Sequence, residues 1–159
     1  MTQPIGYGEY VVSTVPFVVR RRVKWGDCDP AGMVYTVMFS EFVISTAELF
    51  YASLLGGPAY TEMTALGCTT PSRALSFDFQ RSLSVDDEFD IVVRVAEIRT
   101  RTYVLELQGR SLTGEVLFVA TLTPICMPPR ERRAVEIPEV FRRKLEEYRS
   151  TDRRAVRDD

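Results

Sequence analysis

Apolar residues follow two different spacings along this chain. Over residues 37–55 they cover most of the surface of a helix and leave one polar stripe, formed by Glu41, Ser45 and Glu48. A helix with so little polar surface is buried on nearly every side, so the pattern predicts a long central helix. Glycines and a proline at 56–58 predict where it ends.

Elsewhere the apolar residues mainly alternate with polar ones, as in half-buried strands. One such run precedes the long helix and four follow it, separated by short turns: 16–25, 75–80, 89–96, 103–107 and 115–126. The last run is almost continuously apolar, which predicts a strand in the interior of the sheet. The patterns at 61–66 and 139–149 predict two further helices.

A helix that is apolar all round must be enclosed, and a curved sheet can wrap round it. We therefore predict an α+β fold, in which a curved five-stranded antiparallel sheet surrounds the long helix. Length and composition suit one domain, which we expect over residues 15–149. The polar segment 1–14 is expected to be a flexible N-terminal segment, and 150–159 a flexible C-terminal tail.

The chain contains no histidine. This excludes Ser-His-Asp and Cys-His hydrolases, a histidine general base and histidine-containing zinc sites. The three cysteines lack metal-ligand spacing and indicate reduced thiols, with no metal site. The N-terminus lacks the pattern of a secretory signal, so we expect a cytoplasmic protein.

The net charge of −2 disfavours nucleic acid as a partner. Basic residues concentrate between 130 and 157, but acidic residues share that segment, which is typical of a solvated helix and tail. The most apolar stretch is interrupted by Glu41 and Glu48, so no membrane span is expected.

The segment with the most chemical content is the turn at 25–32, with the sequence WGDCDPAG. Its Gly, Asp and Pro residues make the backbone turn sharply and bring Asp27 and Asp29 to the start of the apolar helix. Such a turn can serve only to cap the helix, since Asp accepts hydrogen bonds from free amides. Carboxylates in this position can also act on water or on an acyl group.

This turn, followed by Met33-Val34-Tyr35, closely resembles the active-site segment of the 4-hydroxybenzoyl-CoA thioesterase family, which has the hot-dog fold. The resemblance extends, less specifically, over residues 16–149. It implies an acyl-CoA thioesterase that releases the free acid and CoA without a metal or redox cofactor. It also implies a homo-oligomer, a dimer or a homotetramer, with the site between subunits.

By the same resemblance Asp29 is the catalytic carboxylate, either as nucleophile or as the base that activates water. An aspartate is ionised at pH 7, so Asp29 needs no separate base. The backbone amide of Thr36 would stabilise the oxyanion at the start of the helix, with Tyr35 beside it in the substrate-binding site. Many relatives have Tyr or His where this chain has Thr36, but the backbone amide is independent of that change.

Glu48 is the alternative catalytic carboxylate, because another branch of hot-dog thioesterases uses a carboxylate on the helix. The position that receives a phenol hydroxyl in the 4-hydroxybenzoyl branch is Ile44 in this chain. An isoleucine cannot pair with a phenol, which indicates an aliphatic or unsubstituted aromatic acyl group. Arg99 and Arg101 lie in a turn where relatives bind the CoA nucleotide, and arginine suits its phosphates.

Two residues next to Asp29 are expected to be structural. Asp27 orders the turn through backbone amides. Cys28 has no histidine to activate it, and an unassisted thiol is mostly protonated at pH 7. Two other functions stay open: an acyl-carrier-protein thioesterase, and a non-catalytic acyl-CoA-binding protein. A hot-dog hydratase is disfavoured, since that group relies on a histidine.

Overall fold

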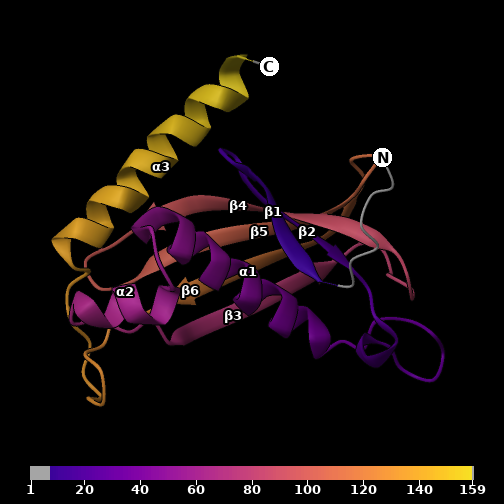
Figure 1. The fold of residues 1–159 in the computed structure, drawn as a ribbon, viewed down its shortest axis with the longest axis horizontal. Helices are drawn as coiled ribbons and strands as arrows, with labels where there is room; N and C mark the ends of the chain where they lie inside the picture. Colours follow the sequence, from indigo (N-terminus) through magenta and orange to yellow (C-terminus); the bar gives the residue numbers. More distant parts are fainter. Residues whose placement is uncertain (1–7, 159) are drawn as a thin grey trace.

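The computed structural model describes residues 8–158 (Figure 1). One six-stranded antiparallel sheet carries a long helix on one face. The elements in chain order are β1 (Glu9–Thr14), β2 (Phe17–Arg22), the 3₁₀ turn η1 (Trp25–Asp27), α1 (Met38–Leu55), α2 (Ala59–Ala65), β3 (Ser72–Phe79), β4 (Glu88–Ile98), β5 (Tyr103–Ser111), β6 (Val116–Pro124) and α3 (Glu139–Asp158).

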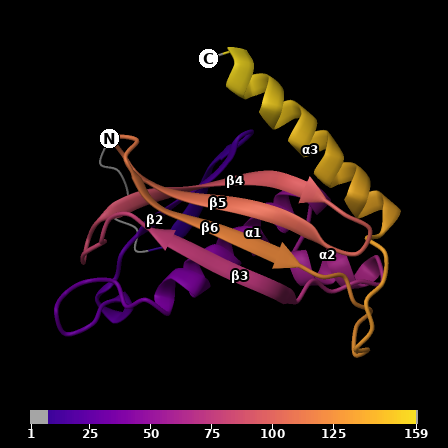
Figure 2. The ribbon, with the colours of Figure 1, turned by 180° about the vertical axis from the view of Figure 1, so that it is seen from behind.

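The strands are ordered β1-β2-β4-β5-β6-β3, and all neighbours are antiparallel. β6 lies inside the sheet, as its apolar sequence predicted. β3 follows the two helices in the chain and forms one edge of the sheet. Viewed from behind, β3 to β6 lie in front of α1 with no helix over them (Figure 2). The helix and the open edge strand are the two elements that position the cavities described below.

The predicted long helix is confirmed as α1, and Gly56 ends it with a left-handed backbone (φ 79°). Its buried face packs on the sheet through Phe39, Phe42, Val43, Thr46, Ala47, Phe50 and Tyr51. The opposite face, with Glu41, Glu48 and Ser53, is exposed, so α1 is less enclosed than predicted. The reason is that the sheet covers only one side of the helix. The length and hydropathy of α1 would also suit a membrane span, but this helix forms part of the protein core.

Three expectations about the ends of the chain need correction. The sheet has six strands rather than five, because residues 9–14 form β1 instead of a flexible segment. Tyr10, Val11 and Val12 are exposed, so β1 is held by backbone pairing with β2 rather than by burial. The tail expected from residue 150 onward is the second half of α3, which continues to Asp158. Residues 1–7 of the expected flexible segment lie outside the described residues.

The helix α3 is amphipathic, and it buries Phe141, Leu145 and Tyr148 at spacings of four and three. The Tyr148 hydroxyl accepts a hydrogen bond from the Phe17 N–H (2.9 Å) and donates one to the Val93 carbonyl (2.6 Å). This single side chain therefore ties α3 to both β2 and β4.

Candidate active site

The loop between β2 and α1 is held in one shape by backbone hydrogen bonds. The buried Asp27 carboxylate accepts from the Lys24 N–H (2.9 Å), and the Asp27 carbonyl accepts from the Tyr35 N–H (2.8 Å). The Val34 N–H donates to the Leu83 carbonyl (2.9 Å), which ties the loop to the segment after β3. Asp27 therefore orders the turn.

Asp29 is fixed by its own turn and keeps one oxygen free. Its Oδ1 accepts hydrogen bonds from the N–H groups of Ala31 (2.9 Å) and Met33 (3.3 Å). Its Oδ2 has no hydrogen-bond partner among residues 8–158. Gly32 closes the turn with φ 80°, a conformation that favours glycine. The loop thus presents a half-buried, oriented carboxylate with an available oxygen.

The amides at the start of α1 are also available. The Thr36 carbonyl accepts from the Phe39 N–H (3.3 Å), but the Thr36 and Val37 N–H groups donate to none of the residues that the structure describes. Free N–H groups at a helix start favour a nearby negative charge. The arrangement suits an oxyanion.

Asp29 and Thr36 line one cavity of about 360 Å³, which we call the Asp29 cavity. Phe39, Phe79 and Leu83 form its apolar wall. Its polar wall includes residues 80–82, Gln-Arg-Ser, which sequence reasoning missed. The only signal for them is a polar segment directly after the strand predicted at 75–80. Arg81, the cation in this wall, forms an ion pair with Glu115 (2.6 Å).

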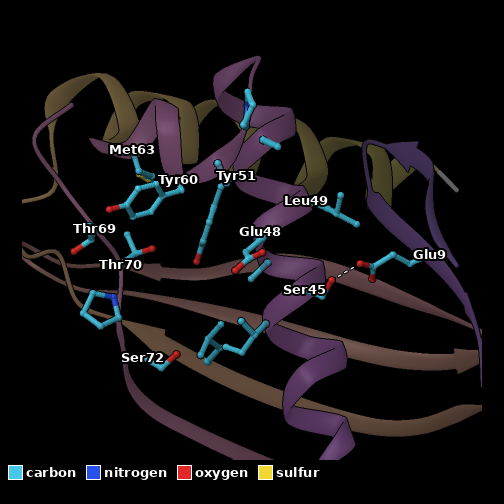
Figure 3. A pocket seen from close by; sticks show the side chains of 17 residues that line it. Glu9, Ser45, Glu48, Leu49, Tyr51, Tyr60, Met63, Thr69, Thr70 and Ser72 are labelled. Atoms are coloured by element: carbon cyan, nitrogen blue, oxygen red, sulfur yellow. Dashed lines mark hydrogen bonds between the residues drawn. The ribbon is translucent and has the colours of Figure 1, made fainter. Parts of the chain in front are cut away.

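A second cavity, of about 570 Å³, lies between α1, α2 and the start of β3 (Figure 3). We call it the helix pocket. Ile44 and Glu48 line it, whereas Asp29 and Thr36 do not. Within one chain the two candidate catalytic carboxylates therefore belong to different cavities.

The other three predicted site residues line neither cavity. Arg99 forms a two-pronged hydrogen bond with its neighbour Glu97 (2.9 and 2.7 Å), and this contact lowers the pKa of Glu97. Arg101 is exposed in the same turn, and Tyr35 is exposed beside Thr36. Their roles in binding substrate stay predictions.

Cys28 lies beside Asp29, but its surroundings disfavour a thiolate. Partial burial, together with the charges of Asp27, Asp29 and Asp87, raises the pKa of the Cys28 thiol. Its Sγ lies 3.7 Å from the Lys24 carbonyl, to which it donates a weak hydrogen bond. A protonated thiol is a poor nucleophile, so Asp29 stays the predicted reactive group of this loop.

Comparison with known proteins shows the family and the fold of this chain. A sequence model of the thioesterase-like superfamily matches residues 23–145. A 1,4-dihydroxy-2-naphthoyl-CoA thioesterase from Synechocystis has a similar structure (TM-score 0.72, 18% identity), covering 81% of this chain and 94% of its own. A gentisyl-coenzyme A thioesterase is also similar (TM-score 0.70, 20% identity; 80% and 98% covered). So is a Staphylococcus aureus protein solved in complex with CoA (TM-score 0.78, 15% identity; 84% of each chain covered).

No curated protein matches the chain. The superfamily match nevertheless covers well over half of the sequence, including the whole of the turn at 25–32 and α1. The structural neighbours confirm the predicted hot-dog architecture, in which a sheet lies against a long helix. The chain therefore belongs to the thioesterase-like superfamily, as a thioester hydrolase with the hot-dog fold.

Proposed function

We propose that the protein is a cytoplasmic acyl-CoA thioesterase, with Asp29 as its catalytic carboxylate and the Thr36 amide as its oxyanion donor. The observation that carries this proposal is that the free Asp29 Oδ2 and the free Thr36 N–H belong to residues of one cavity. The CoA donor is favoured by the neighbours, whose titles name CoA thioesterases or a CoA complex. Three free cysteines suit a reducing compartment.

The reaction needs only these groups and water. As a nucleophile, Asp29 Oδ2 bonds to the carbonyl carbon, the C–S bond breaks, and CoA leaves as a thiolate that takes a proton from water. Water then hydrolyses the mixed anhydride and restores the carboxylate. As a base, Asp29 instead takes a proton from the attacking water, whose oxygen bonds to the carbonyl carbon. The C–S bond then breaks, and Asp29 gives the proton to the departing CoA thiolate. On either route the Thr36 N–H donates to the carbonyl oxygen as it becomes negative, and no metal or redox cofactor takes part.

The edge strand β3 supports a homodimer with shared sites. Phe79, at one end of β3, lines the Asp29 cavity, and Ser72, at the other end, lines the helix pocket. A two-fold axis through the middle of β3 pairs the edges of two copies antiparallel. It also brings the Asp29 cavity of one protomer against the helix pocket of its partner. The acyl group held at Asp29 then extends into the partner's helix pocket, and two such dimers would form a tetramer.

Arginines are the candidates for binding the phosphates of CoA. Arg81 is the cation that lines the Asp29 cavity, and an arginine suits the phosphates of CoA. Arg99 and Arg101 lie farther along the chain, in the turn between β4 and β5, and stay predicted contacts for the nucleotide. Binding of CoA to Arg81→Gln and Arg101→Gln, measured by calorimetry, separates the two assignments.

The test of the proposed function is thiol release from a panel of aliphatic and aromatic acyl-CoAs. We expect Asp29→Asn to reduce kcat by at least about 100-fold while circular dichroism stays unchanged. The matched control is Asp86→Asn, an exposed aspartate with no side-chain hydrogen bond among the described residues, which should retain full activity. Acyl-CoA binding without turnover by the wild type would instead identify a non-catalytic binding protein. Turnover that persists in folded Asp29→Asn would contradict the role of Asp29.

A further inference from the structure

Two of the three cysteines come together behind the wall of the helix pocket. Cys68 lies in the turn after α2, and Cys126 lies just after β6. Thr69 and Met127, the residues that follow them, form an antiparallel bridge through two backbone hydrogen bonds. The Thr69 N–H donates to the Met127 carbonyl (2.6 Å), and the Met127 N–H donates to the Thr69 carbonyl (3.0 Å). Because side chains alternate along paired strands, the two cysteines share one face of this bridge.

The two thiols affect each other's ionisation. The neighbouring Cys126 thiol lowers the pKa of Cys68, and the Met127 N–H acts in the same direction, although burial opposes both. The neighbouring Cys68 thiol, together with burial, raises the pKa of Cys126. A thiolate is the nucleophilic form of cysteine. Cys68 is therefore the reactive member of the pair, and Cys126 retains its proton.

Both thiols are fully buried, but a cavity lies next to them. Thr70 and Tyr51 line the helix pocket (Figure 3). The register that pairs Ser72 with Pro124 places Thr70 opposite Cys126, and Cys126 lies close enough to Tyr51 to affect its pKa. The pocket, at about 570 Å³, is large enough for a molecule the size of hydrogen peroxide to reach this wall.

We propose that Cys68 and Cys126 are a modification site, a peroxide-sensitive thiol pair that closes to a reversible disulfide. The oxidant is a hydroperoxide, with hydrogen peroxide as the simplest member. The Cys68 thiolate attacks one peroxide oxygen and the O–O bond breaks, which leaves a sulfenic acid and a hydroxide that takes a proton to become water. The Cys126 sulfur then attacks the Cys68 sulfur, and its proton leaves with the departing hydroxide as a second water. Two thiols are oxidised and one peroxide is reduced.

The disulfide would add a covalent link to the Thr69–Met127 bridge. It would join the turn after α2 to the segment after β6, and so restrain the wall that Thr69 and Thr70 contribute to the helix pocket. Transient disulfides are the usual form of this bond in a reducing compartment, where cellular thiols reopen it. The inference does not depend on the proposed function, because it concerns the thiols and not the reaction with acyl-CoA.

Cys28 provides an internal control. It is more exposed than the other two cysteines, but the pKa of its thiol is raised. It precedes α1, whereas Cys68 follows α2 near the other end of α1, so Cys28 lies far from the pair (Figure 1). If exposure alone decided oxidation, Cys28 would react first. If the contact between two thiols decides it, the buried pair reacts first.

The experiment treats the folded wild-type protein with hydrogen peroxide and stops the reaction with catalase at a series of times. The protein is then denatured in N-ethylmaleimide, and mass spectrometry of its peptides gives the fraction of each thiol that remains. We expect Cys68 and Cys126 to be lost together, at least about tenfold faster than Cys28. They should appear as one disulfide-linked pair of peptides, and dithiothreitol should restore both thiols.

Two variants test the order of the steps, with circular dichroism to confirm that each folds. In Cys126→Ser the sulfenic acid has no thiol to resolve it, so dimedone added with the denaturant should label Cys68 after peroxide treatment. In Cys68→Ser the remaining Cys126 should stay unlabelled. Equal labelling of the two variants would overturn the assignment of Cys68 as the attacking thiol.

The wild-type measurement alone can overturn the inference, without any substitution in the core. Full alkylation of Cys68 and Cys126 after peroxide treatment would show that they are inert packing residues. Faster loss of Cys28, or oxidation of Cys68 to a sulfinic acid without a disulfide, would contradict the inference as well. None of these results depends on turnover, so failure of this inference and failure of the thioesterase proposal are distinguishable.

Discussion

The Asp29 carboxylate accepts a hydrogen bond from the Ala31 N–H at 2.9 Å, and this contact decides which of its oxygens stays available. Oδ1 is occupied by the backbone of its own turn, whereas Oδ2 is free among the described residues. The turn therefore holds the Asp29 carboxylate in one orientation. Changes to the backbone of this turn should reduce kcat more than they reduce the free energy of unfolding.

Gly32→Ala tests whether the turn holds Asp29 in position. At φ 80° an alanine is strained by about 1–2 kcal/mol, and its methyl group would meet no atom within 4 Å, so the effect is confined to the backbone. We expect a loss of about 1 kcal/mol in the free energy of unfolding, measured with urea, and a fall of tenfold or more in kcat. Gly114→Ala, in the turn between β5 and β6 at φ 89°, should show the same destabilisation with normal kcat. Equal kinetic effects in the two variants would show that the turn does not position Asp29.

Tyr148→Phe should weaken the attachment of α3. The substitution leaves the Phe17 N–H and the Val93 carbonyl without their partner, which should cost about 1–3 kcal/mol of unfolding free energy. Tyr60→Phe, whose side chain is 74% exposed, should cost almost nothing. If both variants unfold at the wild-type urea concentration, the Tyr148 hydroxyl does not hold the helix.

Ionisation of Tyr148 should also destabilise the folded protein at alkaline pH. Burial raises the pKa of Tyr148 from 10.0 to about 12, so the folded protein holds this proton where the unfolded chain releases it. The stabilisation that this pKa difference gives the folded protein is complete below pH 10 and is lost as the pH rises from 10 to 12. We expect the unfolding free energy to fall over this window, and to fall less steeply in Tyr148→Phe. Because burial also raises the pKa values of Tyr51 and Tyr103, part of the slope should remain. An identical slope in the variant would contradict this account.

Cys28→Ala should retain at least half of the wild-type kcat, because the thiol is protonated and takes no part in the chemistry. Hydrolysis followed by thioester absorbance avoids interference from protein thiols. A loss as large as that of Asp29→Asn would transfer the nucleophile to the cysteine.

The proposed dimer predicts that a charge on β3 separates the subunits. Ser76 is exposed near the middle of β3, so Ser76→Glu places two carboxylates close to the proposed two-fold axis. Thr121→Glu is the matched control, because Thr121 is the exposed partner of Ser76 on the interior strand β6. Light scattering after size exclusion should show a smaller particle for Ser76→Glu alone. A dimer that survives this change would exclude β3 as the interface.

The periodic parts of this sequence predicted structure well. The helix expected at 37–55 is α1, and the interior strand expected at 115–126 is β6, because both patterns reflect burial. β1 was missed because its side chains are mostly exposed, so they carry no alternation that the sequence could reveal. The second half of α3 was missed because its charged residues are equally typical of a tail.

The candidate site was likewise predicted only in part from the sequence. Asp29 and Thr36 were predicted through the family resemblance of residues 25–35, and the structure brings both to the Asp29 cavity because they lie in one continuous segment. The polar wall at 80–82 could not be predicted, since it reaches Asp29 through the pairing of Val34 with Leu83. Glu48 and Thr70 likewise come together in the helix pocket only when the loop before β3 folds against α1.

The central claim is that Asp29 of one subunit acts on an acyl group held in the helix pocket of the other. Mixing two inactive variants tests it: Asp29→Asn, and Ile44→Trp, which fills the helix pocket. Each parent is first shown to fold and dimerise, and subunit exchange is confirmed with two affinity tags. A hybrid dimer keeps one complete site, made from the Asp29 of the second variant and the open pocket of the first. We predict that a fully exchanged equimolar mixture recovers about a quarter of the wild-type activity. A mixture that exchanges subunits and stays as inactive as its parents would contradict the shared site.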